Sequence, residues 1–224
     1  MKIASRTHQG LVRLNNEDCL YHDAELGIAV LADGMGGLLA GEEASRVATF
    51  EAQEKMVEGC ELAEIVALAH KAVRRRAEEK KYVGKMGTTL IVWQNSEFAH
   101  VGDSRIYSLI GDEITQLSKD QTVAQRMVDE GLIPPEEAHL APKKNVLTQA
   151  IGMPGDVRPE EGQTPEVGRL LLCSDGLSDL VDIEVIKNGL CLPDIEDAAE
   201  QLVKEALDKG GRDNISVIVI DLDV

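Results

Sequence analysis

The 224-residue sequence is poor in aromatic and in basic residues. It contains one Trp, three Tyr and two Phe, and its 23 Lys and Arg are outnumbered by 40 Asp and Glu, which gives a formal net charge of −17. Few aromatic rings leave little surface on which the bases of single-stranded nucleic acid stack. The acidic excess repels nucleic-acid backbones and anionic lipid. The composition therefore predicts no nucleic-acid partner and no membrane partner.

The sequence also lacks long apolar runs and paired cysteines. No apolar run approaches the roughly 20 residues of a membrane-spanning helix, and the N-terminal MKIASRTHQG has no signal-peptide core. The cysteines at positions 19, 60, 173 and 191 form no C-x-x-C pair. These absences predict a cytoplasmic protein with free thiols.

Short apolar or alternating segments recur along the chain, many of them separated by short turns, which favours antiparallel sheets over parallel crossovers. Strands are predicted at 2–7, 19–22, 27–32, 88–94, 96–101, 105–110, 113–116, 157–163, 169–173 and 215–222. Helices are predicted at 41–58, 61–81, 123–130, 146–151, 183–188 and 195–209. No repeat or linker divides the chain, so we predict one domain over residues 1–224, with mobile loops at 131–163.

Acidic residues stand at the ends of several of these segments, beside glycine or another small residue. The clusters are NNED (15–18), ADG (32–34), GDS (102–104), SDG (174–176) and RDN (212–214). A single Asp-Gly pair is typical of an exposed turn. Four of the five clusters, however, adjoin segments expected to be buried, where an unpaired carboxylate is costly. Either these carboxylates are exposed at turns, or a shared counter-charge holds them.

The candidate ligands are all oxygen donors, because no His or Cys accompanies them. Oxygen ligands suit Mg²⁺ or Mn²⁺, leave Ca²⁺ open and argue against zinc. Such ions retain water and can support metal-assisted hydrolysis. The glycines after Asp33 fit neither a dinucleotide-binding nor a Walker pattern, and Gly34 allows the backbone to approach an ion closely.

In the same order, these clusters resemble the metal-dependent serine/threonine protein phosphatases of the type 2C (PPM) family in their compact bacterial form. The matching stretches are RLNNED (13–18), ADGMGG (32–37), GTT (87–89), VGDSR (101–105), CSDGL (173–177) and GGRDN (210–214). The resemblance covers nearly the whole chain. It implies an α+β fold, a four-layer α/β/β/α sandwich with two central, mostly antiparallel sheets flanked by helix pairs.

The resemblance also implies two Mg²⁺ or Mn²⁺ ions and a third, weaker metal site. Asp33 would bridge the two ions, with the carbonyl of Gly34 on one of them. Asp175 and Asp213 would complete the other ion, and Glu17 would act through water. Asp103, together with Asp175, would form the third site.

The implied reaction is hydrolysis of phosphoserine or phosphothreonine by in-line attack of a water held between the two ions. Its catalytic residues would be Asp33, Asp175, Asp213 and Arg13, and the planar fork of Arg13 would bind the substrate phosphate. Supporting groups would be Asp18, Thr88, Thr89, Ser104 and Asn214. Asp18 would orient waters, and the hydroxyl and amide groups would hydrogen-bond the ligating carboxylates.

The sequence departs from the family pattern at three places. Many relatives have a histidine where Gln121 stands, so a histidine general acid is lost there, and Gln149 replaces a common arginine. The run GGLL (36–39) makes the rim of the site more apolar than the Gly-Gly-His of many relatives. These changes concern protonation of the leaving group and substrate preference, because no implied metal ligand is missing.

Three rival functions are weighed against this interpretation. A catalytically weak regulatory binding protein with the phosphatase fold predicts loss of carboxylates, yet Asp33, Asp175 and Asp213 are present. A calcium-stabilised binding protein would carry EF-type loops, and a nuclease would carry a basic track. The expected partner is a phosphorylated protein, such as a Hanks-type kinase or one of its targets, and the expected state is a monomer.

Overall fold

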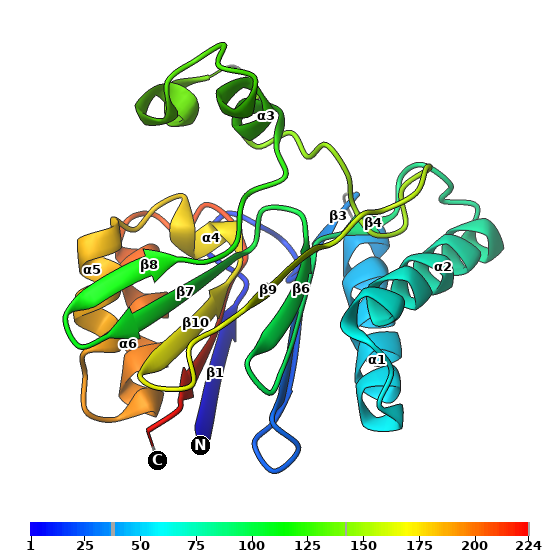
Figure 1. Cartoon of the computed structure of the whole chain (residues 1–224). Helices are drawn as coiled ribbons and strands as arrows, with labels where there is room; N and C mark the ends of the chain where they lie inside the picture. Colours follow the sequence, from blue (N-terminus) through cyan, green and yellow to red (C-terminus); the bar gives the residue numbers. More distant parts are fainter. Residues whose placement is uncertain (37–38, 142, 224) are drawn as a thin grey trace.

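A computed structural model describes residues 1–36, 39–141 and 143–223, and Figure 1 shows its layers. Two sheets pack face to face between two helix pairs. One pair consists of α1 (Leu39–Glu58) and α2 (Leu62–Lys80), and the other of α5 (Ile183–Leu190) and α6 (Ile195–Asp208). The predicted α/β/β/α sandwich is confirmed.

The first sheet has the strand order β1-β11-β10-β7-β8, with every pairing antiparallel. Its strands are β1 (Lys2–His8), β7 (Arg105–Ile110), β8 (Glu113–Gln116), β10 (Arg169–Cys173) and β11 (Ile215–Asp221). Strand β11 lies inside the sheet, and all seven of its residues are buried. An unbroken apolar run is what a strand covered on both faces requires.

The second sheet has the order β2-β3-β5-β6-β9, and a short strand, β4, pairs with β3. Its strands are β2 (Asp18–Asp23), β3 (Ile28–Met35), β4 (Gly87–Thr88), β5 (Leu90–Gln94), β6 (Glu97–Val101) and β9 (Glu160–Gln163). The register of β2 on β3 places Asp18 opposite Asp33. Two of the acidic clusters are therefore neighbours at one end of this sheet.

Alternation along β3 and β5 separates two apolar layers. Leu31 and Ile91 face the first sheet, whereas Val30 and Val92 face α1 and α2. Buried alanines recur every four residues along α1, at positions 40, 44, 48 and 52. This row of small side chains lets the helix lie close to the sheet and fixes where its first turn meets the end of β3.

Two sequence predictions of secondary structure are wrong. Residues 146–151 do not form a helix but an extended segment, with isolated bridges from Leu147 to Thr122 and from Ile151 to Thr88. Six residues are too few for a stable isolated helix, and bonding to neighbouring strands satisfies their backbone instead. The strand predicted from residue 157 begins only at Glu160, and the short helix α4 (Asp175–Ser178) was not predicted.

Between β8 and β9, helix α3 (Val123–Asp129) and the 3-10 helix η1 (Pro135–Leu140) stand apart from the sheets, near the strand ends where the acidic clusters lie (Figure 1). Mobility of 131–163 and a single domain over 1–224 stay predictions, and residue 142 lies outside the described residues. In the part of the chain that is described, no helix is both long and apolar enough to cross a bilayer.

Candidate active site

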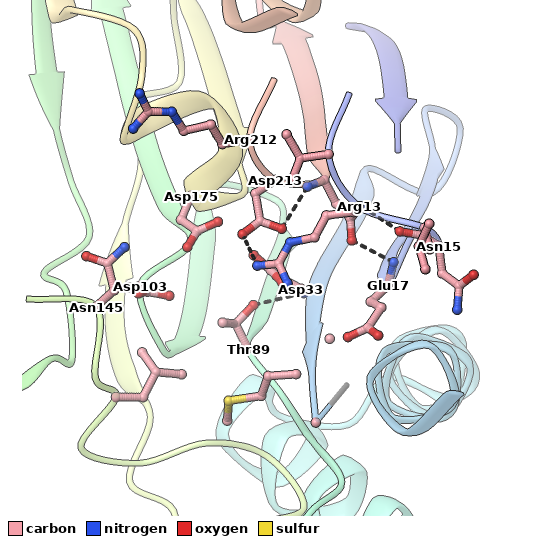
Figure 2. A pocket seen from close by; sticks show the side chains of 17 residues that line it. Arg13, Asn15, Glu17, Asp33, Thr89, Asp103, Asn145, Asp175, Arg212 and Asp213 are labelled. Carbon is pink, nitrogen blue, oxygen red and sulfur yellow. Dashed lines mark hydrogen bonds and ion pairs between the residues drawn. The ribbon is translucent and has the colours of Figure 1, made fainter. Parts of the chain in front are cut away.

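All five acidic clusters meet at one end of the sandwich, around a cavity of about 630 Å³ (Figure 2). They come from five separate segments: the loop between β1 and β2, the end of β3, the β6–β7 turn, the start of α4, and the loop before β11. The acidic residues lining the cavity are Glu17, Asp33, Asp103, Asp175 and Asp213. The sequence prediction that these strand ends share one site agrees with this arrangement.

Burial and mutual repulsion disfavour the charged forms of these carboxyl groups. Desolvation, followed by the charges of neighbouring aspartates, raises the pKa of both Asp33 and Asp175 well above 3.8. Desolvation also raises the pKa of Asp103 to about 7 and that of Asp18 to about 6. Positive charge placed between these carboxyl groups would favour their ionised forms.

Asp18 lies at the base of this cluster, and sequence reasoning missed its main partner. The Ser174 hydroxyl donates to Asp18 Oδ2 at 2.9 Å and accepts from the backbone N–H of Ser216 at 3.0 Å. The other oxygen, Asp18 Oδ1, is buried without a hydrogen-bond partner among the described residues. An unpartnered buried carboxylate oxygen fits a group that accepts further positive charge or water. The signal for Ser174 was its place next to Asp175.

Gly34 is required by close packing of backbone. A Cβ atom on this residue would lie 2.2 Å from the carbonyl oxygen of Gly41 and 2.5 Å from that of Glu17. The Gly34 N–H donates to the same Glu17 carbonyl at 3.1 Å. Three segments therefore meet at the end of β3 only because residue 34 has no side chain. The role of its carbonyl as a metal ligand stays a prediction.

Gly41 leaves room for the Glu17 side chain in the same way. A Cβ atom there would lie 2.1 Å from Glu17 Oε2, so this carboxylate rests against the first turn of α1. Desolvation raises the pKa of Glu17. Gly37 and Leu38, part of the rim that the sequence predicts to be apolar, lie outside the described residues.

Arg13 reaches into the acidic cluster from the loop between β1 and β2. Its Nη2 donates to Asp213 Oδ2 at 2.5 Å, and this hydrogen bond is the largest influence raising the pKa of Arg13 (Figure 2). The Arg13 side chain is 56% exposed. The structure thus places the expected phosphate-binding arginine at the mouth of the site, paired with an expected metal ligand.

The hydroxyl groups below the cluster hold the end of β3 through its backbone. Thr89 Oγ1 accepts from the Asp33 N–H at 3.0 Å and pairs with Ser104 Oγ at 2.8 Å. Thr88 Oγ1 donates to the Asp33 carbonyl oxygen at 2.8 Å. These groups were expected to hydrogen-bond the carboxylates, whereas their hydrogen bonds among the described residues fix the main chain that carries the Asp33 carboxylate.

Asn214 joins the loop before β11 to the loop between β1 and β2, again through hydrogen bonds to backbone. Its Oδ1 accepts from the Glu17 N–H at 2.8 Å, and its Nδ2 donates to the carbonyl oxygens of Gln9 and Asn15, each at 2.8 Å. These bonds, too, reach backbone and not a carboxylate. Asn214 thereby positions the segment that carries Glu17 and Arg13.

The turn that carries Asp103 has supports that the sequence did not indicate. Gln121 Oε1 accepts from the Gly102 N–H at 2.9 Å, and Gly102 has a φ of +116°. Arg105 binds both carboxylate oxygens of Asp120, at 2.7 to 3.2 Å. The residue that departs from the family pattern, Gln121, thus holds the backbone next to Asp103.

A second cavity of about 310 Å³ adjoins the first and includes Asp103, Asp175 and Asp179 in its lining. Asn145, from the segment after η1, lines both cavities and donates to Asp179 Oδ2 at 2.6 Å. Both residues expected at the third metal site therefore lie where the two cavities meet.

The donor set suits hard divalent cations. Its candidate ligands are carboxylate and carbonyl oxygens, and desolvation together with the charges of neighbouring aspartates raises the pKa of Asp33 and Asp175. Among the described residues, no three His, Cys, Asp or Glu side chains already stand in an arrangement that could hold an ion. Asp213, one of the predicted ligands, is hydrogen-bonded to the Arg13 guanidinium.

Comparison with known proteins points to a single family. The family described as Protein phosphatase 2C matches residues 5–210. The serine/threonine protein phosphatase PstP of Mycobacterium tuberculosis is 39% identical over 236 residues, which cover 99% of this chain and 45% of PstP. The chain thus spans about half the length of that relative. The protein phosphatase PhpP of Streptococcus pneumoniae is 34% identical over 242 residues, which cover 99% of this chain and 98% of PhpP.

A solved structure extends this similarity to three dimensions. It is the catalytic domain of PstP in complex with two manganese ions, and it matches with a TM-score of 0.83 at 38% identity over 98% of this chain and 97% of that domain. At this level of identity, the likeness concerns both fold and sequence.

Proposed function

The chain belongs to the protein phosphatase 2C family, and from this premise we propose that it is a metal-dependent protein serine/threonine phosphatase. The observation that carries the proposal is the meeting of Glu17, Asp33, Asp103, Asp175 and Asp213 at one cavity. Five chain segments deliver these carboxylates, and structural stability alone would favour separating them.

We assign the metal sites from this donor set. Asp33 and the Gly34 carbonyl would hold one Mg²⁺ or Mn²⁺ ion, Asp33 would share a second with Asp175 and Asp213, and Glu17 would act through water. Asp103 and Asp175 are the candidates for a third, weaker site. When bound, such ions would supply an activated water and stabilise charge on the phosphoryl group.

Arg13 would bind the phosphate of the substrate. Its guanidinium lies at the mouth of the cavity, and its planar fork matches two phosphate oxygens. For this, Asp213 would hold a cation in place of its hydrogen bond with Arg13. Arg13 would then be free to turn toward the substrate phosphate, because Asp213 would have another partner for its charge.

Two groups of residues keep this arrangement in place. Asp18 and Ser174 would orient waters beneath Asp33, and Thr88, Thr89 and Ser104 hold the main chain of β3. Gln121 has no titratable proton and its amide is engaged with Gly102, so it positions the turn at Asp103 and does not protonate the leaving group.

The substrate we propose is a phosphorylated protein, with a Hanks-type kinase or one of its targets as candidates. The names of the relatives support a protein substrate, since PstP and PhpP are both protein phosphatases. We further propose a cytoplasmic monomer. The free thiols of Cys19, Cys60, Cys173 and Cys191 support a reducing compartment.

The test is hydrolysis of p-nitrophenyl phosphate and of a phosphothreonine peptide with Mn²⁺, Mg²⁺, Ca²⁺ or EDTA. We expect turnover with Mn²⁺ or Mg²⁺, none with EDTA, and loss of turnover in Asp33→Asn. Asp112→Asn, at the opposite end of the sheets, is the matched control and should retain activity. Turnover that survives EDTA would refute the metal mechanism. Tight binding of the phosphopeptide without any turnover would favour the rival function, a regulatory binding protein.

A further inference from the structure

Exposed apolar residues flank Arg13 in the chain. Leu11 is 66% exposed, Val12 65% and Leu14 88%, and Val12 and Leu14 line the cavity that holds the carboxylates. A single exposed apolar residue is ordinary, whereas Leu11, Val12 and Leu14 all lie within two positions of one cation in the chain; these three residues are the apolar patch. Leu147, half-buried, lines the same cavity from the segment that follows η1.

The loop that carries this patch is held firmly. Leu11 N–H donates to the Gly211 carbonyl oxygen at 2.7 Å, and Gln9 Nε2 donates to the Arg13 carbonyl oxygen at 2.7 Å. Asn214 Nδ2 donates to the carbonyl oxygens of Gln9 and Asn15, on either side of these residues in the chain. The exposed side chains therefore do not reflect a loose loop. Side chains presented on a fixed backbone lose less entropy when they bind.

From these observations we infer that the mouth formed by Val12, Leu14 and Leu147 binds apolar side chains that flank the phosphorylated residue of the substrate. The inference rests on the proposed function and specifies its substrate class. With the phosphate at Arg13, the residues next to the phosphorylated one lie only about 4 to 7 Å away along the chain, because consecutive Cα atoms are 3.8 Å apart. Val12 and Leu14 adjoin Arg13 in the chain and line the same cavity, which places them at the mouth that a substrate segment enters.

The charge of the protein bears on whether acidic or basic residues could flank the phosphorylated residue instead. The net charge of −17 repels an acidic flank, although Arg212 at the same cavity is one cation that such a flank would meet. A basic flank is attracted by the carboxylates but repelled by Arg13 and Arg212, which line the same cavity. Burial of apolar surface is therefore the interaction that Val12 and Leu14 provide.

The test uses phosphothreonine peptides that differ only at the residues before and after the phosphothreonine: Leu, Ser, Glu or Lys at both positions. The readout is the ratio of kcat/KM between the Leu-flanked and the Ser-flanked peptide, in which effects common to both substrates cancel. We expect roughly tenfold in favour of Leu, mainly through KM, as for apolar side chains entering an apolar site. Val12→Asn/Leu14→Asn should reduce this ratio to about twofold or less.

Leu26→Asn is the matched control. Leu26 is 48% exposed in the turn between β2 and β3, at the opposite end of the sheet, so this variant should keep both the ratio and the turnover of p-nitrophenyl phosphate. Because Val12 and Leu14 are exposed, the double variant should remain folded, which denaturant unfolding verifies.

A ratio near one in the wild type, an unchanged ratio in the double variant, or a preference for Glu or Lys flanks would overturn the inference while leaving the phosphatase proposal intact. Absence of metal-dependent turnover of p-nitrophenyl phosphate and of every peptide would instead refute the proposed function, and the inference with it.

Discussion

The two ends of the sandwich use the same residue types for opposite purposes. At one end Asp33 and Gly34 lie near the end of β3. The carboxyl group of Asp33 is desolvated there, and a Cβ on Gly34 would lie 2.2 Å from the carbonyl oxygen of Gly41. At the other end Gly111 and Asp112 connect β7 to β8. There the glycine has a φ of +59° with nothing within 4 Å of its Cβ position, and the aspartate side chain is 91% exposed.

Glycines with positive φ occur at both ends, for example Gly102 (+116°) beside Asp103, so the contrast lies in what the connections join. Four connections at the far end contain residues with positive φ: Gly27 (+64°), Asn95 (+48°), Gly111 (+59°) and Gly168 (+85°). The first three close hairpins, β2–β3, β5–β6 and β7–β8, in which glycine or asparagine is favoured by backbone conformation, whereas Gly168 lies where the chain passes from β9 in one sheet to β10 in the other. At the cavity end, the connections that carry the acidic clusters either join the two sheets, as between β1 and β2 and between β6 and β7, or join a strand to a helix, as after β3 and β10 and before β11. An Asp-Gly pair thus indicates a site only where the strand before it is buried and no hairpin follows.

The largest expected effect is on catalysis. Asp33→Asn should lower kcat/KM by about 10³-fold or more, at or beyond the loss of one stabilising group in an active site. Asp112→Asn should change kcat/KM less than about twofold, because its exposed ion pair with Lys187 contributes little. Steady-state kinetics with p-nitrophenyl phosphate and Mn²⁺ measures both. Equal losses in the two variants would mean that the ends do not differ in function.

Glycine-to-alanine substitutions should separate the free-energy cost of a steric clash with backbone from the cost of a positive φ. Gly34→Ala forces a Cβ against two carbonyl oxygens and should lower the free energy of unfolding by about 3 to 4 kcal/mol. Gly111→Ala meets only the cost of positive φ, about 1 kcal/mol. Urea unfolding of both variants checks this order, and the reverse order would contradict the packing argument.

The acidic cluster should make stability depend on pH when a chelator removes metal. The pKa of Asp18 rises from 3.8 to about 6 on folding, so the folded chain binds more protons than the unfolded chain between these values. Its contribution to stability is therefore present below pH 3.8 and is lost as pH rises toward 6. The loss is on the order of 3 kcal/mol, since one pKa unit corresponds to ~1.4 kcal/mol.

Asp18→Asn isolates this effect. In EDTA it should show a smaller decrease of the free energy of unfolding between pH 4 and 6 than the wild type, whereas Asp112→Asn should decrease as the wild type does. Urea unfolding across this pH range is the measurement. A free energy of unfolding that rises with pH in the wild type, and rises equally in Asp18→Asn, would show that the buried Asp18 carboxylate does not destabilise the metal-free protein.

The smallest effect concerns the hydroxyl groups. Thr89→Val removes the acceptor of the Asp33 N–H and should cost about 2 kcal/mol, because a buried donor is left unpaired. Thr115→Val, on the exposed strand β8, should change stability by less than about 0.5 kcal/mol. Thermal unfolding of the two variants compares them, and similar shifts in Tm would argue against a supporting role for Thr89.

Much of the fold follows from local sequence, because apolar alternation and turn residues act over a few positions. β11 and α6 were predicted nearly to their ends for this reason. The segment at 146–151 was not, since its conformation depends on bridges to Thr88 and Thr122, far away in the chain. Long-range pairing of this kind leaves no periodic signal.

The candidate site divides in the same way. The carboxylates could be predicted, because Asp beside Gly after an apolar run conflicts with burial unless charge is shared. The partners of Ser174 and Gln121 could not, since a hydroxyl or amide that bonds a group far away in the chain has no pattern that identifies that group. The hydrogen bond between Arg13 and Asp213 joins residues two hundred positions apart and emerges only in the folded chain.

The central claim is that only the cavity end of the sandwich gathers charge in order to hold cations. Isothermal titration with Mn²⁺ tests it most directly, independently of turnover. We predict that the wild type and Asp112→Asn each bind at least two ions per chain, and that Asp33→Asn loses this binding. Unchanged stoichiometry and affinity in Asp33→Asn would contradict the account.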